Sequence, residues 1–226
     1  EFQVINALKT NRSKRSKSGE LFIEGIESIK QARAANLEFT RIITTNVNNV
    51  STWAMGLIRQ NSAAKIIEMS QPLYTKICDR EQPSEIVVTA KMPKFDLQHV
   101  TLSENPCVLI FDRPSNYGNF GTIIRSANSF AVDAVFIMGH AIDPFDPKVI
   151  RSSLGAIFHT QVSNIVSTSA LESWLAIQKD KNGLQVVGTD STGSVSLGNH
   201  KLQKPVALIL GNEAKGMSVA LQKLCD

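Results

Sequence analysis

The chain alternates between short apolar runs and stretches in which apolar residues recur at helical spacing. In its first part, this pattern predicts strands at 22–23, 41–45, 65–68 and 85–89. The intervening stretches predict helices over 26–33, 51–60 and 70–78. Strands and helices that alternate at these lengths indicate a small parallel or mixed sheet with helices around it.

The second part begins with a nearly all-apolar run at 107–111, which is typical of a strand buried on both faces in a parallel sheet. A helix over 121–130 and a strand at 134–138 complete a β-loop-α-β unit. The remaining predicted elements are helices over 148–154, 169–179 and 215–224 and strands at 160–166, 184–188 and 205–210. We therefore predict an α/β fold whose second part is a parallel-sheet domain.

The stretch between residues 91 and 106 has two prolines, mixed charge and no sustained period. We interpret it as a connection, because a chain of 226 residues is long enough for two domains of ordinary size. The predicted domains are 1–92 and 106–226, with a linker over 93–105.

Composition narrows the class of protein. A hydrophobic fraction of 42% and a charged fraction of 19% are typical of a globular protein. No apolar run approaches the roughly 20 residues of a membrane-spanning helix, and the first residues offer no secretory signal, so we expect no membrane partner. The three cysteines are far apart and the four histidines are scattered, which argues against a disulfide framework and against a metal site. We predict a cytoplasmic protein without a metal.

The net charge of +4 is unevenly distributed. Residues 1–95 carry 14 Lys and Arg against 9 Asp and Glu, while residues 96–226 carry 10 against 11. The excess is densest in a polar segment that holds Lys9, Arg12, Lys14, Arg15 and Lys17. One interpretation is a solvated, partly disordered leader. The other is an arm that binds the phosphates of a polyanion and gains affinity through counterion release.

Two loops between a strand and a helix carry the candidate chemistry, because ligands of open α/β sheets bind at the carboxyl ends of the strands. The first, 112–125, has glycines at 118 and 121 that allow tight turns, and Arg125 follows about one helical turn later. The second, 208–218, is similar to a phosphate-binding GxxxxGK(S/T) loop, but Met217 replaces the lysine. Neither loop fits the GxGxxG pattern of a dinucleotide-binding fold. Spacing alone therefore indicates only a ligand-binding α/β domain.

Three segments together resemble the SpoU/TrmH branch of the SPOUT RNA methyltransferases. They are NFGTIIRSA at 119–127, DPFDPKVIRSSLGA at 143–156 and LGNEAKGMS at 210–218, in suitable order and separation. This resemblance covers residues 106–226. The stretch 12–25, which includes GELFIEG, more loosely resembles the start of the L30-like substrate-binding domain of rRNA-modifying members.

The resemblance implies a SPOUT domain whose parallel sheet threads a trefoil knot at its C-terminal end, beside a smaller N-terminal α/β L30-like domain. It also implies a homodimer with the knot at its interface. The implied cofactor is S-adenosylmethionine, bound by groups of the knot loops at Thr189, Gly211, Asn212 and Gly216. The family's pattern continues past the last helix with Ile-Pro-Met and Ser-Leu-Asn-Val-Ser, whereas this sequence stops at Asp226, so we expect the end of the knot to be missing. Ala131 also replaces a usual glycine.

The same resemblance places the catalytic residues at Asn119, Arg125 and Glu213. A guanidinium stays protonated, so we expect Arg125 to orient the ribose or a phosphate and to stabilise developing negative charge. Asn119 would fix its loop, and Glu213 would hold the two knot loops together. Each has a structural alternative: Arg125 as a surface ion pair, Asn119 as a helix cap, and Glu213 as a carboxylate in the first turn of a helix.

The expected activity is 2′-O-methylation of RNA ribose. The predicted RNA-binding residues are Arg12, Lys14, Arg15, Lys17, Arg151 and Ser153. The separate N-terminal domain favours rRNA over tRNA as the partner, because an extra module enlarges the surface that reads RNA shape. A tRNA methyltransferase and a non-catalytic RNA-binding or assembly protein with the same fold remain the alternatives.

Overall fold

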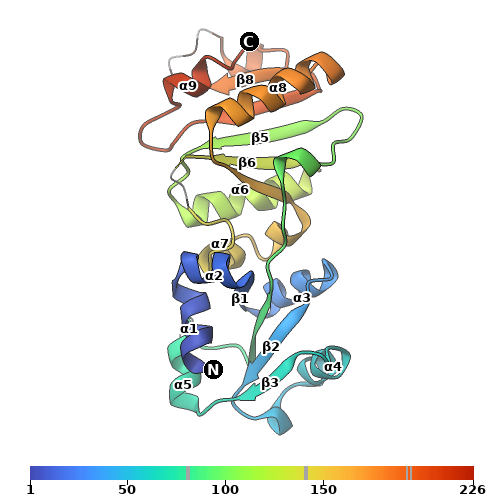
Figure 1. Cartoon of the computed structure of the whole chain (residues 1–226), viewed down its shortest axis with the longest axis vertical. Coiled ribbons are helices and arrows are strands. Elements are labelled where there is room, and N and C mark those ends of the chain that lie inside the picture. The colour runs from blue at the N-terminus through green and yellow to red at the C-terminus, as the bar shows by residue number, and fades with distance from the viewer. Residues whose placement is uncertain (80–81, 140–141, 192, 194) are drawn as a thin grey trace. The chain divides into compact units, whose positions relative to one another are not determined.

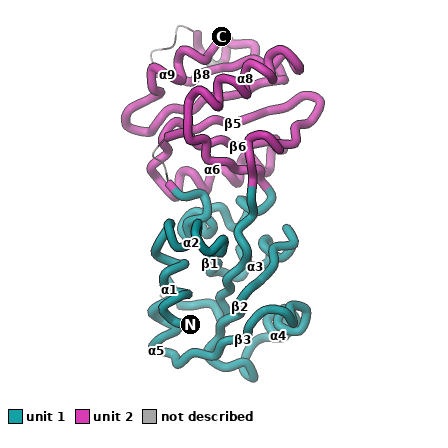
Figure 2. Tube along the Cα trace, in the orientation of Figure 1, with its two compact units in different colours: residues 1–94, 143–159 teal, residues 95–142, 160–226 magenta. Residues whose placement is uncertain are grey.

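The computed structural model describes residues 1–79, 82–139, 142–191, 193 and 195–226. These residues form two compact units, drawn in different colours in Figure 2. Unit 1 comprises Glu1–Lys94 together with Asp143–His159. Unit 2 comprises Phe95–Ile142 and Thr160–Asp226. The second segment of unit 1 therefore comes from the middle of the sequence that the pattern predicts as one parallel-sheet domain.

Unit 1 is built on a four-stranded mixed sheet in the order β1-β4-β2-β3. Its strands are β1 (Glu20–Glu24), β2 (Phe39–Thr44), β3 (Lys65–Glu68) and β4 (Ile86–Lys91). Strand β4 is antiparallel to both neighbours, and β2 is parallel to β3. The mixed sheet confirms the prediction for the first part of the chain.

Helices cover both faces of this sheet (Figure 1). They are α1 (Phe2–Thr10), α2 (Arg12–Ser18), α3 (Ile26–Ala34), α4 (Thr52–Gln60) and α5 (Gln71–Ile77), with a 3-10 turn at Val47–Asn49. Helices α1 and α5 pack with Phe22 and Ile43 into one core, whereas the adjacent Ile42 points to the opposite face. This alternation buries both faces of β1 and β4 and most of β2, whereas β3 at the edge of the sheet is largely exposed.

The basic N-terminal segment is helical, so its interpretation as a disordered leader is wrong. Helix α1 buries Ile5 and Leu8 against the sheet. Asn11 begins the next helix by accepting a hydrogen bond from the Lys14 backbone N–H over 3.1 Å. Gly19 ends that helix at φ +65°, a conformation that glycine adopts without strain, and β1 follows at once.

Unit 2 has a five-stranded sheet in the order β7-β6-β5-β9-β8, and every neighbouring pair is parallel. Its strands are β5 (Cys107–Asp112), β6 (Ala134–Met138), β7 (Gln161–Ile165), β8 (Gln185–Thr189) and β9 (Val206–Leu210). The nearly all-apolar strands at the centre, β5 and β6, are covered on both faces. The parallel-sheet prediction is therefore confirmed.

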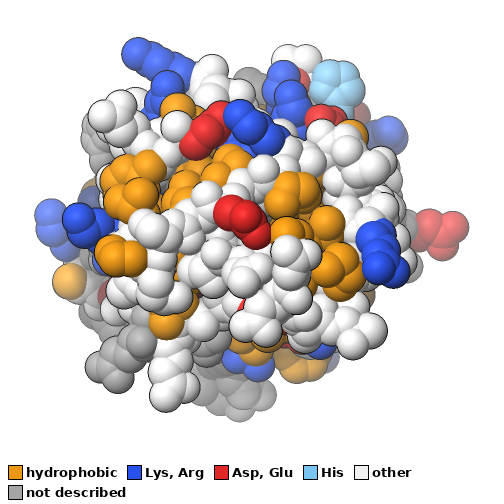
Figure 3. All heavy atoms as spheres, turned by 90° about the horizontal axis from the view of Figure 1, so that it is seen from below, with side chains coloured by type: hydrophobic (Ala, Val, Ile, Leu, Met, Phe, Trp, Pro, Cys, Tyr) orange, Lys and Arg blue, Asp and Glu red, His pale blue; other side chains and the backbone are white. Residues whose placement is uncertain are grey.

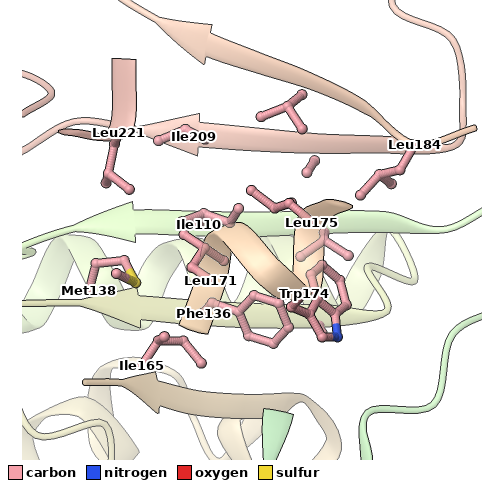
Figure 4. Close-up of a cluster of buried hydrophobic side chains, with 14 of the residues drawn as sticks. Ile110, Phe136, Met138, Ile165, Leu171, Trp174, Leu175, Leu184, Ile209 and Leu221 are labelled. Atoms are coloured by element: carbon pink, nitrogen blue, oxygen red, sulfur yellow. The ribbon is translucent and has the colours of Figure 1, made fainter. Parts of the chain in front are cut away.

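Two long helices cover the faces of this sheet. Helix α8 (Thr168–Asn182) contributes Leu171, Trp174 and Leu175 to the cluster in Figure 4, where the Trp174 ring meets Phe136 edge-on at 4.9 Å. Helix α6 (Tyr117–Ser129) lies on the other face, where Phe120 meets Phe111 edge-on at 5.5 Å.

The last predicted helix, over 215–224, is mostly wrong. Residues 211–217 form a tight turn, and α9 spans only Val219–Gln222. The cause is local, because Asn212 and Gly216 exchange two backbone hydrogen bonds of 3.0 and 2.9 Å and Gly216 adopts φ +65°. The predicted linker contains a 3-10 turn at Leu97–His99, and Leu97, Val100 and Leu102 pack on the core of unit 2.

Candidate active site

The candidate site of unit 2 lies where β5, β9 and β8 end. The register aligns Phe111 with Leu210 and Leu210 with Thr189. Parallel strands in register bring their carboxyl ends to the same edge of the sheet. The loops that follow, from Arg113, Gly211 and Asp190 onward, therefore emerge at one edge.

Asp112 and Arg113 join the first of these loops to the second. Asp112 is buried and accepts hydrogen bonds from Arg113 Nε over 2.7 Å and from the Ser218 backbone N–H over 2.6 Å. Arg113 has φ +53°, which is uncommon for a residue with a side chain, and its backbone carbonyl accepts from Asn212 Nδ2 over 2.7 Å. Burial tends to raise the pKa of Asp112, but the hydrogen bonds from Arg113 and Ser218 outweigh it and hold the pKa below its ordinary value.

The 211–217 turn is closed so tightly that its first residue must be glycine. A Cβ at Gly211 would lie 2.5 Å from the Met217 backbone nitrogen and 2.6 Å from the Gly216 carbonyl carbon. The Asn212 side chain completes the turn, because its Oδ1 accepts from the backbone N–H groups of Ala214 and Lys215, each over 3.0 Å. The turn is thus a fixed piece of backbone at the end of β9.

Glu213 connects this turn to the loop after β5. Its carboxylate accepts from the hydroxyl of Ser115 over 3.1 Å and from the backbone N–H groups of Ser115 and Asn116, each over 3.4 Å. Burial raises its pKa less than these hydrogen bonds lower it, so the pKa lies below its ordinary value. Because α9 begins only at Val219, Glu213 is not in the first turn of a helix.

A cavity of about 790 Å³ opens beside these loops in unit 2. Its walls include Thr189 and Leu210 at the strand ends and Met217 of the tight turn. A cavity of this size lies in the range of small-molecule and cofactor sites. His200 also lines it, and its buried Nε2 has no hydrogen-bond partner in the described part of the chain.

These walls fit a cofactor with an aromatic base and polar groups. Val187, Leu210 and Met217 offer apolar surface, and the unpartnered His200 Nε2 offers a hydrogen-bonding atom that a polar ligand would satisfy. Of the predicted cofactor residues, Thr189 lines the cavity itself. The other three, Gly211, Asn212 and Gly216, shape the turn that places Met217 in its wall.

Comparison with known proteins assigns this arrangement to a family. The model of the SpoU rRNA methylase family matches residues 106–226, and that of the SpoU L30e-like domain matches residues 1–88. The chain belongs to the SpoU rRNA methylase family. It is 32% identical over 227 residues to the 23S rRNA (uridine(2479)-2'-O)-methyltransferase of Streptomyces viridochromogenes, a match that covers 100% of this chain and 79% of that protein.

Two further relatives support this membership. The crystal structure of the SpoU methyltransferase AviRb from S. viridochromogenes, in complex with the cofactor AdoMet, has a TM-score of 0.92 and 32% identity and covers 100% of this chain and 85% of that chain. The 23S rRNA (guanosine(2553)-2'-O)-methyltransferase RlmP of Bacillus subtilis is 24% identical, over 95% of this chain and 80% of the relative. The predicted SpoU/TrmH membership is thereby confirmed.

The catalytic residues predicted for this SpoU methylase lie on α6 and in the tight turn. Asn119 is not the cap of α6, because Asn116 accepts the hydrogen bond from the Asn119 backbone N–H over 2.9 Å. Both Asn119 and Arg125 are exposed. No described residue forms an ion pair with Arg125, so its interpretation as a surface ion pair is wrong for the described part of the chain.

Two of the predicted RNA-binding residues are buried, which corrects their assignment. Arg15 is 1% exposed and paired with Asp143 and Asp146, so its guanidinium is not available to phosphate. Ser153 is fully buried, and its hydroxyl donates to the Ile150 carbonyl over 3.0 Å.

The other predicted RNA-binding residues have accessible side chains. Arg151 is partly exposed and forms ion pairs with Glu24 and Asp79, each at 3.3 Å. The exposed residues are Arg12, Lys14 and Lys17, all in α2.

The residues that hold the loops together, Asp112, Arg113 and Asn116, lie within the first predicted loop, but the sequence alone indicates no role for them. An Asp at the end of a buried strand is only a weak indication of a loop contact. The partner of Asp112, Ser218, lies 106 residues later in the sequence, so the local pattern does not reveal the pair. The expected absence of a metal stays a prediction: the described residues contain no cluster of potential ligands, and His140 lies outside them. None of the described helices has both the length and the apolar character of a membrane span.

Proposed function

We propose that this protein is an S-adenosylmethionine-dependent rRNA methyltransferase that modifies the ribose 2′-oxygen. The observation that carries the proposal is the cofactor-sized cavity beside Thr189, Leu210 and Met217, in a chain that matches the AdoMet complex of AviRb over its whole length. This chain spans about four fifths of the length of two relatives that are named as 23S rRNA 2'-O-methyltransferases. Their names favour rRNA over tRNA as the substrate. One acts on a uridine and the other on a guanosine, so the proposal does not extend to the base.

The domain roles are part of this proposal. Residues 1–92 would bind RNA and 106–226 would carry the transferase site, with 93–105 between them. The trefoil knot, the homodimer and the cytoplasmic location remain predictions from the family resemblance.

S-adenosylmethionine supplies an activated methyl group when it is bound. What the chain must add is a fixed geometry, because in-line transfer to a hydroxyl depends on alignment of the reacting atoms. The Glu213 contacts with Ser115 and Asn116 fix the start of α6 relative to the tight turn. In this proposal Glu213 and Asn119 are positioning residues for the substrate side of the site.

Arg125 is the residue that we propose to meet the RNA at the reacting ribose. Its exposed guanidinium is not engaged by any described carboxylate, so it can bind a phosphate or ribose oxygen without first breaking an ion pair. A permanently protonated group cannot take the hydroxyl proton, and its contribution is stabilisation of negative charge that develops on the attacking oxygen.

Helix α2 is the proposed phosphate-binding element of unit 1, because Arg12, Lys14 and Lys17 are exposed on one short helix. Figure 3 shows the structure from below the view of Figure 1. Among the described side chains on that face, hydrophobic groups surround an acidic side chain, and Lys and Arg lie mainly toward the margin. A face of that composition is less suited to a polyanion than α2 is.

The test is calorimetric titration of the protein with S-adenosylmethionine, followed by transfer of a labelled methyl group to unmodified 23S rRNA transcript. We expect saturable binding and a ribose-methylated nucleotide in the product. Arg125→Ala should abolish transfer and change cofactor affinity by no more than a few-fold. Binding without transfer to any rRNA would favour a tRNA substrate, and absence of binding would favour a non-catalytic RNA-binding protein.

A further inference from the structure

The connection between β6 and β7 belongs to the other unit. Strand β6 ends at Met138 and β7 begins at Gln161, and both are neighbours in the sheet of unit 2. Most of the chain between them, Asp143–His159, nevertheless packs as part of unit 1. It contains α7 (Pro147–Ser152), which packs against β1, and a 3-10 turn at Ala156–His159, which packs against α3. We call residues 143–159 the crossover segment.

Arg15 of α2 holds the start of the crossover segment. Its Nε and Nη2 reach Asp143 Oδ2 at 2.9 and 2.7 Å, and Nη2 donates to Asp146 Oδ2 over 3.1 Å. Its Nη1 donates to the backbone carbonyls of Leu8 and Lys9 over 2.9 and 3.1 Å. The same Asp146 begins α7 by accepting from the Lys148 backbone N–H over 3.0 Å. One buried guanidinium therefore connects α1, α2 and the beginning of α7.

The rest of the crossover segment is held just as closely within unit 1. Arg151 pairs with the buried Glu24 of β1, and the Ser28 hydroxyl donates to the Ile150 carbonyl over 3.4 Å. At Gly155, with φ +83°, a Cβ would lie 2.6 Å from Gln31 Cβ and 3.1 Å from Ser28 Cα. Packing this close leaves the segment no room to move independently of α3 and β1.

The two faces of α2 thus have different tasks. Lys14 and Lys17 are exposed, whereas Arg15 points inward to Asp143 and Asp146. We infer that Arg15 is a positioning residue that couples RNA binding at α2 to the crossover segment and so to methyl transfer by unit 2. The inference rests on the proposed function. It adds a route by which RNA bound at α2 affects the crossover segment, whose two ends continue into the adjacent strands β6 and β7 of unit 2.

The test separates RNA binding from turnover in Arg15→Gln. The matched control is Arg41→Gln, which removes another arginine of unit 1 that pairs with two carboxylates, Glu1 and Glu20, but does not touch the crossover segment. With 23S rRNA transcript as the probe, we expect Arg15→Gln to keep RNA affinity within threefold and S-adenosylmethionine affinity within twofold, and to lose at least tenfold in kcat at saturating RNA. Arg41→Gln should stay within twofold in all three.

Wild-type kcat in a folded Arg15→Gln variant would overturn the inference, whatever its RNA affinity. Hydrogen exchange on the wild-type protein provides a second test that needs neither a folded variant nor catalysis. Adding the same transcript should slow amide exchange in α7 as well as in α2. Protection confined to α2 would contradict the coupling. The proposed function itself fails if S-adenosylmethionine does not bind or if the wild-type protein transfers no methyl group to rRNA.

Discussion

Two ion-paired arginines, Arg15 in unit 1 and Arg113 in unit 2, differ in which partner of the pair is buried. In unit 1 the cation is buried: Arg15 is 1% exposed, while Asp143 and Asp146 keep 11% and 19%. In unit 2 the anion is buried: Asp112 is 4% exposed and Arg113 keeps 34%. A buried charge without its partner is far more costly than an exposed one, so the effect of a substitution depends on which partner remains.

The largest effect is expected where the remaining partner is the buried cation. Asp143→Asn with Asp146→Asn leaves the Arg15 guanidinium buried without a countercharge, and should lower the free energy of unfolding by about 3–5 kcal/mol. Urea unfolding at neutral pH measures it. The control, Glu1→Gln with Glu20→Gln, leaves Arg41, whose side chain is 18% exposed, and should lower the free energy of unfolding clearly less. Equal losses in both double variants would show that burial of the remaining arginine does not determine the loss of stability.

In unit 2, the contact between the loop after β5 and the 211–217 turn depends on backbone geometry as well as on charge. Gly211→Ala tests this dependence. The added Cβ would meet the Met217 nitrogen at 2.5 Å, so the turn must shift together with the adjacent Ser218, whose backbone N–H donates to Asp112. We expect a loss of about 1–3 kcal/mol in unfolding free energy and at least a tenfold loss in S-adenosylmethionine affinity by calorimetry. Gly56→Ala in α4 is the matched control, because its Cβ meets nothing within 4 Å. Unchanged cofactor affinity in Gly211→Ala would show that the turn does not shape the site.

Removing Arg113 in unit 2 should lower the free energy of unfolding less than removing the carboxylates of Asp143 and Asp146 in unit 1. Arg113→Gln leaves Asp112 with its hydrogen bond from the Ser218 backbone, and water can reach the vacated position. The expected loss is about 1–2 kcal/mol in urea unfolding. A loss as large as that of the Asp143/Asp146 double variant would mean that the Ser218 hydrogen bond and access of water do not reduce the destabilisation caused by the unpaired Asp112.

The smallest effect is a dependence on pH. Asp112 and Glu213 both have a pKa below the ordinary value in the folded protein. Their contribution to stability is therefore complete above the unfolded-state pKa, about 4, and is lost as the pH falls through the lower folded-state pKa. Unfolding measured from pH 6 down to pH 3 should show this loss, and Arg113→Gln should reduce the part due to Asp112. An identical acid profile in that variant would contradict the assigned cause of the shift.

Much of the fold could be predicted because its strands are set by local pattern. The strands at 65–68 and 134–138 have the predicted bounds, and the apolar run from Cys107 begins a fully covered strand. Helix α2 could not be predicted in this way, because its sequence is polar and it is stabilised by the cap at Asn11. Helix α1 has apolar residues at helical spacing, Phe2, Ile5 and Leu8, a signal that our prediction missed, and the helix is stabilised by burial of Ile5 and Leu8.

The site was predictable only in outline. Glycines and family motifs identified the loops around Gly118 and Gly211, since tight turns need glycine wherever they occur. The role of Arg15 was not visible, because composition places a charged side chain at the surface and its partners lie about 130 residues away in sequence. The contact between Asp112 and Ser218 was not visible either, because the two residues are distant in sequence and meet only after the sheet has formed.

A crystal structure of the protein with S-adenosylhomocysteine would show whether the cavity of unit 2 is the cofactor site. We expect the ligand in the cavity of unit 2, with its base against Leu210 or Met217 and a polar group within hydrogen-bonding distance of Thr189 or His200. A ligand bound elsewhere, with that cavity left open, would contradict this expectation.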